Sequence, residues 1–189
     1  MGVIELGGVH GVGKSTTIEA ASRLVDRPVP ILKGSVIMAR ILGVSTEDLP
    51  TESPERRQWA RELMFKELDE ARNGVRDSHF SVYTDSGYEF PFTPTDIGLV
   101  NAAVVIEASK ETVLARRQRI ERDRPKDIAQ IEEQLYLERQ GAEEAARKLA
   151  VPLFYIRNED GDNAPMHLAE IFKEYLDKII LSGRIKLWQ

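Results

Sequence analysis

The chain has 189 residues, a formal net charge of -5 and 42% hydrophobic residues. This length and composition predict a single soluble domain, covering residues 1–189, with a sizeable hydrophobic core. The acidic balance argues against broad binding to nucleic acid, and the absence of cysteine excludes disulfides and thiolate metal sites. The sequence begins without a basic leader or a long apolar run, so we expect a cytoplasmic protein with no membrane segment.

Short apolar runs alternate with segments of helical periodicity along the whole chain. Strands are predicted at 3–6, 29–32, 81–85, 102–108 and 153–156. Helices are predicted from Lys14, over 35–42, from Ser53-Pro54 to about Asn73-Gly74, over about 109–120 and 127–149, and from Asn163-Pro165 to Ser182-Gly183. This alternation predicts a five-stranded parallel sheet with helices on both faces. Ligands bind at the carboxyl ends of such strands, where we expect the first glycine-rich loop, Asp85, Ala108 and Asn158.

The glycine-rich stretch at residues 8–15 fits the pattern G-x-x-x-x-G-K-[ST] at every fixed position. Glycines let the backbone wrap around a phosphate group, and the following helix N-terminus adds partial positive charge. We therefore expect ATP and Mg²⁺ as cofactors, with the Lys14 ammonium at the β- and γ-phosphates and the Ser15 hydroxyl on the metal. The predicted nucleotide ligands are Gly8, Val9, His10, Gly11, Val12, Gly13, Lys14, Ser15 and Thr16. His10 either meets the nucleotide or fills a variable position of the motif.

The loop alone does not define a reaction. A GTPase normally adds an N-K-x-D motif, which this chain lacks, and a transporter-type ATPase needs a longer chain. A small kinase fits best, so the rest of the chain should supply an acceptor site and further cations. The segment 116–126 carries six basic residues against two acidic ones. We interpret it as a phosphate-binding lid at about 119–127, with Arg119, Arg122 and Arg124 as the candidate catalytic residues. The alternative is a solvated helix end.

Glu107-Ala108, the helix that follows it and the arginine-rich turn resemble the nucleoside monophosphate kinase family. The order of motifs is most similar to archaeal-type adenylate kinases: Gly34-Ser35 opens a short helix, a strand ends at Asp85, and Arg122-Asp123-Arg124 stands at the short lid. The resemblance implies a three-layer P-loop kinase fold and transfer of the ATP γ-phosphate to AMP. It also implies that Arg139 contacts phosphate, that Asn158 lies against adenine, and that the chain forms homo-oligomers. For Arg139, an exposed helix position is the equal alternative.

The acceptor is expected in a region covering about 33–73 together with the loop that follows Asp85. Its candidate ligands are Gly34, Ser35, Arg40 and Tyr88, and Asp85 orders Mg²⁺ or orients the acceptor oxygen. Arg40 otherwise caps its helix, and Tyr88 otherwise packs its loop. Ser35 and Gly87 stand where the family has aspartate and histidine. The sequence thus favours an AMP-directed kinase, with another small acceptor, or an acceptor-free nucleotide-binding ATPase or switch, as alternatives.

Overall fold

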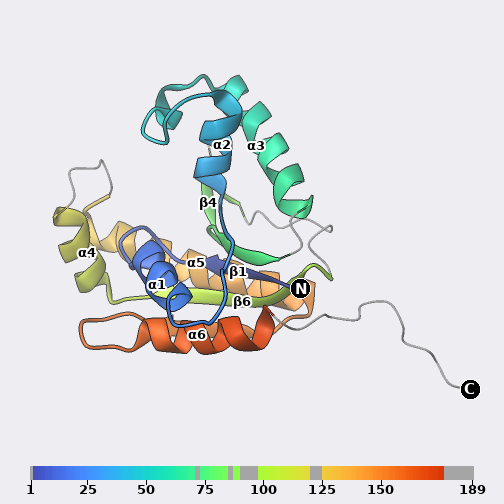
Figure 1. Ribbon diagram of the computed structural model, residues 1–189. Helices are drawn as coiled ribbons and strands as arrows, with labels where there is room; N and C mark the ends of the chain where they lie inside the picture. The colour runs from blue at the N-terminus through green and yellow to red at the C-terminus, as the bar shows by residue number, and fades with distance from the viewer. Residues whose placement is uncertain (1, 71–72, 85–86, 90–97, 120–124, 177–189) are drawn as a thin grey trace, which may run out of the picture.

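The main sheet has five strands, and the predicted α/β architecture is confirmed. The computed structural model describes residues 2–70, 73–84, 87–89, 98–119 and 125–176 (Figure 1). The strands are β1 (Val3–Gly7), β2 (Ile31–Lys33), β3 (Gly74–Asp77), β6 (Val100–Glu107) and β7 (Leu153–Arg157). They lie in the order β2-β3-β1-β6-β7, and every neighbouring pair is parallel. All five carboxyl ends therefore meet at one edge of the sheet, as the sequence predicts.

One predicted strand is wrong. The sequence 81–85 does not enter the main sheet: Val82–Thr84 forms β4, which pairs antiparallel with β5 (Gly87–Glu89) in a separate hairpin. The place next to β1 belongs to β3, and its last residue is Asp77. Asp85 itself lies outside the described residues. The carboxylate expected at the end of this strand is therefore supplied by a different residue.

Helices cover both faces of the sheet, and their bounds follow the predicted ones closely. They are α1 (Lys14–Ser22), α2 (Gly34–Leu42), α3 (Pro54–Glu70), α4 (Lys110–Gln118), α5 (Ile128–Leu149) and α6 (Ala164–Tyr175), with a 3₁₀ turn at Leu49–Thr51. Three of them begin at polar caps: Ser53, which was predicted as one, and Ser109 and Asp127 each accept a hydrogen bond from a backbone N–H three residues on. The predicted end of the last helix, at Ser182-Gly183, lies outside the described residues.

The core is divided between the two faces of the sheet. One face packs Leu6, Val104 and Ile106 against Ile18 of α1 and Phe172 of α6. The other face packs Ala103 and Val105 of β6 against Ala142, Ala145 and Ala146 of α5 and against Phe80. Figure 1 shows α6 and α5 on opposite sides of the strands. Burying both faces explains why the central strands are nearly continuous apolar runs.

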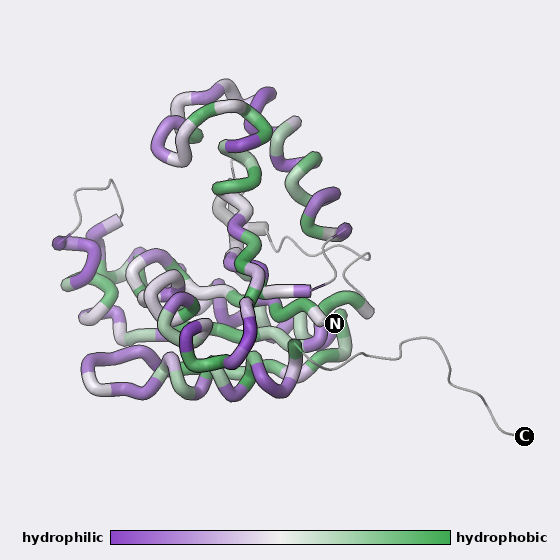
Figure 2. The backbone as a smooth tube through the Cα atoms, viewed as in Figure 1, coloured by the Kyte–Doolittle hydropathy of each residue, from purple (hydrophilic) through white to green (hydrophobic). Residues whose placement is uncertain are grey.

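The helices α2 and α3 stand away from the sheet and pack mainly on each other. Their contact is a small separate cluster of Ile37, Met64 and Leu68. Gly34 allows this approach, because a Cβ there would lie 2.8 Å from the Met64 sulfur. Figure 2 shows hydrophobic and hydrophilic residues in alternation along both helices, as expected for elements with one buried face.

A buried ion pair joins the two central strands β1 and β3. Glu5 and Arg76 face each other in register, and Arg76 Nη1 lies 3.7 Å from Glu5 Oε2. Both residues are 5% exposed. Arg76 Nη2 also donates to the Leu68 carbonyl at 2.6 Å, and the Ser78 hydroxyl donates to Glu5. These bonds satisfy charged groups that would otherwise be costly to bury.

Candidate active site

The loop between β1 and α1 has the backbone of a phosphate cradle. Gly8, Gly11 and Gly13 have φ values of 142°, 99° and 91°, which side chains with a Cβ rarely adopt. The space is restricted as well: a Cβ on Gly8 would lie 2.5 Å from the Ile106 carbonyl, and one on Gly13 would lie 2.5 Å from Asn158 Nδ2. The predicted glycine spacing is therefore required by both conformation and packing.

Lys14 and Ser15 are the first two residues of α1, where the helix exposes its backbone N–H groups. The Lys14 ammonium donates to the Gly8 carbonyl across the loop. The Thr17 hydroxyl donates to the Gly13 carbonyl at 2.9 Å, which fixes the turn into the helix. Positive charge thus gathers at the place where the sequence predicts phosphate. Val9 is buried and His10 exposed, while Thr16 is exposed on α1.

Asp77 is the site residue that the sequence interpretation missed. It ends β3, and its Oδ2 lies 3.5 Å from the Ser15 hydroxyl. A serine hydroxyl and a carboxylate are oxygen donors that Mg²⁺ accepts together with phosphate oxygens and water. Ser15 and Asp77 therefore form a donor set suited to Mg²⁺, as was predicted for Ser15 and Asp85.

Replacing the predicted strand at 81–85 by β3 also affects one point of the resemblance to adenylate kinases. Asp77 is followed two positions later by His79, the spacing at which the resemblance expects a histidine. The apparent departure at Gly87 came from placing the strand at 81–85. The His79 ring packs edge-on against the His10 ring, with centroids 4.7 Å apart. His10, which the motif leaves variable, therefore lies against the segment that follows β3.

Glu138 is a second residue that the sequence interpretation missed. It lies on α5, is 2% exposed, and accepts the backbone N–H of Gly8 at 2.6 Å. It also accepts the N–H groups of Phe80 and Ser81, both at 2.9 Å. Burial raises the pKa of Glu138, but the hydrogen bond and charge of His79, the Phe80 N–H and the charge of Lys14 outweigh burial and lower that pKa to about 2.

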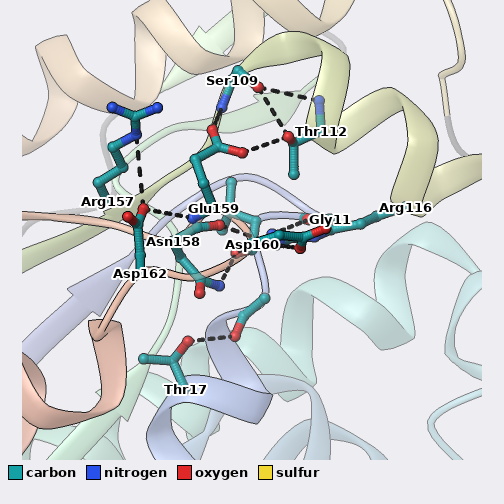
Figure 3. A network of polar contacts seen from close by, with 12 residues as sticks. Gly11, Thr17, Ser109, Thr112, Arg116, Arg157, Asn158, Glu159, Asp160 and Asp162 are labelled. Carbon is teal, nitrogen blue, oxygen red and sulfur yellow. Dashed lines mark hydrogen bonds and ion pairs between the residues drawn. The ribbon is translucent and has the colours of Figure 1, made fainter.

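Arg116 and Asn158 hold the other side of the loop (Figure 3). Arg116 donates to the carbonyls of Val12 and Asn158, each at 3.0 Å, and Asn158 Nδ2 donates to the Val12 carbonyl at 2.6 Å. Glu159, next in the chain, accepts hydrogen bonds from Ser109 and Thr112 at the start of α4. Asn158 thus lies beside the loop. Its described role is to hold backbone, and contact with a base stays a prediction.

Arg117 connects the loop to the end of the predicted lid. Its side chain is buried and donates to the carbonyls of His10 and Pro125, both at 2.8 Å, and to Gln134 Oε1 at 2.9 Å. Arg119 follows directly as the C-terminal cap of α4. Arg122 and Arg124 lie outside the described residues. The first two arginines of the cluster are therefore structural, and the role of the other three as lid residues stays a prediction.

Arg139 is engaged by a carboxylate. It lies on α5 and makes a two-pronged ion pair with Glu107, at 3.0 and 2.7 Å, while its guanidinium lies 4.5 Å from the centre of the Tyr155 ring. The hydrogen bond that Arg139 donates to Glu107 raises the pKa of Arg139. The geometry matches the helix-surface alternative, and contact with phosphate stays a prediction.

The predicted acceptor residues are distributed over α2 and the hairpin: Gly34 and Ser35 at the start of α2, Arg40 in its last turn and Tyr88 in β5. Gly34 and Ser35 open α2 directly after β2, at the carboxyl edge of the sheet. Arg40 points to α3, where it pairs with Glu67 on the exposed surface. Tyr88 is half-buried in β5 opposite Tyr83. The described contacts of Arg40 are thus those of a surface ion pair between two helices.

No helix within the described residues is long and apolar enough to cross a membrane. The parallel order of the sheet, the glycine loop and the lysine at the N-terminus of α1 together define a P-loop nucleotide-binding protein. A family model described as an AAA domain (AAA_17) matches residues 7–134. This covers more than half of the chain, and the protein therefore belongs to this family. A search of curated protein sequences finds no match.

Solved structures share the fold at low sequence identity. The shikimate kinase from Acinetobacter baumannii, in complex with shikimate, is 18% identical with a TM-score of 0.59, covering 98% of this chain and 96% of that one. The shikimate kinase from Bacteroides thetaiotaomicron is 17% identical with a TM-score of 0.55, covering 91% and 98%. The YorR protein from Bacillus subtilis, in complex with phosphorylated GDP, is 17% identical with a TM-score of 0.58, covering 91% and 94%. The fold is therefore that of P-loop small-molecule kinases.

Proposed function

We propose that the protein is an ATP-dependent phosphotransferase that moves the γ-phosphate of MgATP to a nucleoside monophosphate, with AMP favoured. The observation that carries this proposal is the meeting of Lys14, Ser15 and Asp77 at the carboxyl edge of the sheet, with Ser15 and Asp77 3.5 Å apart. Asp77-Ser78-His79 supports the likeness to adenylate kinases better than the segment at Asp85 does. The AMP preference rests on that resemblance.

In this mechanism the chain positions charge and forms no covalent bond to the substrate. The loop N–H groups and the N-terminus of α1 bind the ATP phosphates, and the Lys14 ammonium neutralises charge on the transferred group. The Ser15 hydroxyl and the Asp77 carboxylate would hold Mg²⁺, which shields the phosphate oxygens from the approaching acceptor. Arg119, Arg122 and Arg124 are proposed to add guanidinium groups from the lid. Closing that lid would exclude water and limit ATP hydrolysis.

A small acceptor that carries a hydroxyl group and no phosphate is the second candidate. The reason is that described arginines which could bind an acceptor phosphate already pair with carboxylates. Among the described residues, Arg40 pairs with Glu67 and Arg76 with Glu5, so these two cations already face carboxylates. A phosphate-bearing acceptor would need cations available to it. The two shikimate kinases among the similar folds make an alcohol the natural alternative to test.

A panel of acceptors tests the proposal. The protein is incubated with MgATP and, in separate reactions, AMP, CMP, UMP, dTMP, shikimate or no acceptor, and the products are separated by chromatography. We expect ADP to form fastest with AMP, at two ADP for each ATP consumed, because both products of that reaction are ADP. Phosphorylated shikimate without any new nucleoside diphosphate would support the alcohol acceptor instead. Phosphate release that is independent of every acceptor would exclude the kinase and indicate an ATPase or switch.

A further inference from the structure

Glu138 joins two segments that carry opposite halves of the site. Its Oε1 accepts the N–H of Gly8 at 2.6 Å and the N–H of Phe80 at 2.9 Å. Its Oε2 accepts the Ser81 N–H at 2.9 Å and the Ser81 hydroxyl at 2.8 Å. Four donors from two chain segments thus converge on one buried carboxylate from a third segment, α5.

The two joined segments lead to the groups that face each other across the metal position. Gly8 begins the loop that ends at Lys14 and Ser15, whereas Phe80 and Ser81 follow Asp77 and continue into β4 of the hairpin. The position of the Ser15 hydroxyl relative to the Asp77 carboxylate therefore depends on how these segments are fixed to each other. Among the described contacts, Glu138 is a buried side chain that hydrogen-bonds the backbone of both, and the rings of His10 and His79 add a second contact between them.

The surroundings of Glu138 are built for a carboxylate. Gly7 leaves the space for it, because a Cβ at that position would lie 2.8 Å from Glu138 Oε1. His79 Nδ1 lies 3.7 Å from the same oxygen, which adds a cation when the imidazole is protonated. A glutamine has the same shape but only one acceptor oxygen, so its NH₂ group would face one pair of donors. Removing acceptors leaves buried N–H groups without partners, which costs more than an average hydrogen bond.

We propose that Glu138 is a positioning residue of the phosphoryl-transfer site, which fixes the donor loop to the segment after β3 so that Ser15 and Asp77 hold Mg²⁺ together. This role rests on the proposed function, because it assumes that the site transfers a phosphoryl group. It concerns only the binding of MgATP and MgADP, so it can be tested without an acceptor. The specific consequence is that Glu138 determines how much more tightly the site binds a nucleotide with Mg²⁺ than the same nucleotide without it.

The test compares the Kd of a non-hydrolysable ATP analogue with and without Mg²⁺ by calorimetry, at a temperature well below the Tm of every variant. In the wild type we expect Mg²⁺ to tighten binding of the analogue. In Glu138→Gln we expect the Kd of the magnesium-bound analogue to rise roughly tenfold, while the Kd of the metal-free analogue changes less. Glu144→Gln is the matched control, since Glu144 lies on the same helix and pairs with Lys148 on the surface. It should bind like the wild type.

A purely structural role predicts a different result. It would lower the Tm of Glu138→Gln but leave the ratio of the two Kd values at the wild-type level, which would overturn the proposal. If Glu138→Gln does not fold, Ser81→Ala serves in its place, because it removes only the hydroxyl donor and should reduce the Mg²⁺ advantage by a smaller factor. A wild-type ratio in folded Ser81→Ala would then overturn it. If no acceptor in the panel is phosphorylated but the variant still shows a reduced effect of Mg²⁺ on the Kd, the kinase activity is rejected and the positioning role is kept.

Discussion

The donor side and the acceptor side of this molecule are held together in different ways. Around the P-loop, buried charged side chains bind backbone: Glu138 is 2% exposed and Arg117 3% exposed, and each contacts the loop and at least one distant segment. On the acceptor side, α2 and α3 pack through a small apolar cluster and an exposed ion pair between Arg40 and Glu67, whose side chains are 60% and 46% exposed.

This difference indicates where the protein has fixed its chemistry and where it has left room for change. A loop whose backbone is bonded to buried side chains keeps one geometry, which suits a phosphate group common to all nucleotides. A pair of helices joined by a small apolar cluster and an exposed ion pair can change with less effect on the rest of the fold, which suits the half proposed to select the acceptor. Substitutions on the donor side should therefore lower turnover strongly. Substitutions on the acceptor side should change the free energy of unfolding only slightly.

The largest effect is expected from Lys14→Ala, which removes the cation at the transferred phosphate. We expect turnover to fall by at least about a hundredfold, because groups that stabilise charge in a transition state contribute on that scale. The Tm should change little, since the described hydrogen bond of Lys14 stays within the loop. A coupled ADP assay and thermal unfolding measure the two quantities. Activity close to wild type would contradict the assignment of Lys14.

The second comparison decides between two aspartates. Asp77→Asn should lower turnover by roughly tenfold to a hundredfold and raise the Mg²⁺ concentration needed for half-maximal rate, because Asp77 lies beside Ser15. Asp85→Asn is the matched change at the residue that sequence reasoning first selected. It should leave the Mg²⁺ requirement unchanged. The opposite result would return the metal role to Asp85.

Alanine substitutions at two glycines with positive φ distinguish the effect of steric crowding from the effect of backbone strain. Gly13→Ala places a methyl group 2.5 Å from Asn158 Nδ2, whereas Gly43→Ala meets nothing within 4 Å. Both changes cost on the order of 1–2 kcal/mol for a left-handed residue. Only Gly13→Ala should also weaken nucleotide binding, by roughly tenfold, as measured by calorimetry. Equal binding by the two variants would mean that the loop accommodates the added methyl group.

Acid should weaken the donor side through Glu138. Because its folded pKa of about 2 lies below the ordinary value of 4.5, its stabilisation is complete above pH 4.5 and is lost as the pH falls towards 2. The shift corresponds to stability on the order of 3 kcal/mol in full, of which about 2 kcal/mol should be lost by pH 3. Urea unfolding at pH 5 and pH 3 measures this, and Glu138→Gln should show a smaller difference. An equal difference in both proteins would place the acid sensitivity elsewhere.

The smallest effect is expected from Arg40→Ala on the acceptor side. Exposed ion pairs contribute about 0–1 kcal/mol, so the free energy of unfolding should fall by less than about 1 kcal/mol. If Arg40 instead binds the acceptor phosphate, the KM for AMP should rise with kcat and the KM for ATP unchanged. Glu67→Gln is the control, because it breaks the same pair without removing the cation.

Most of the fold follows from sequence patterns, and the one error has a physical cause. The strand at 74–77 has only four residues, and one of them, Arg76, is a buried charge paired with Glu5. Apolar periodicity does not detect such a strand. The segment 81–85 contains Val82, Tyr83 and Thr84, residue types that are enriched in strands, and sequence reasoning therefore places it in the sheet.

The site residues were predictable where they belong to a local sequence motif. They were not predictable where they depend on contacts between residues far apart in the sequence. The P-loop motif fixes Lys14 and Ser15 in sequence, because the backbone conformation requires its glycines. Glu138 lies 130 residues from Gly8, so no local motif connects the two, although its position falls on the buried face of α5. A glutamate at an otherwise core-facing helix position is the only signal that sequence offered, and it is a weak one.

The buried pair of Glu5 and Arg76 has a consequence for how the chain folds. Side chains alternate along a strand, so if β3 slid past β1 by one residue, Arg76 would turn to the opposite face and Glu5 would lose its cation. Separating such a pair costs about 3–5 kcal/mol, which penalises every misaligned pairing. Asp77 sits on the opposite face from Arg76, next in the chain. This buried pair thus selects the register of β3 that brings the aspartate to Ser15 as the sheet assembles.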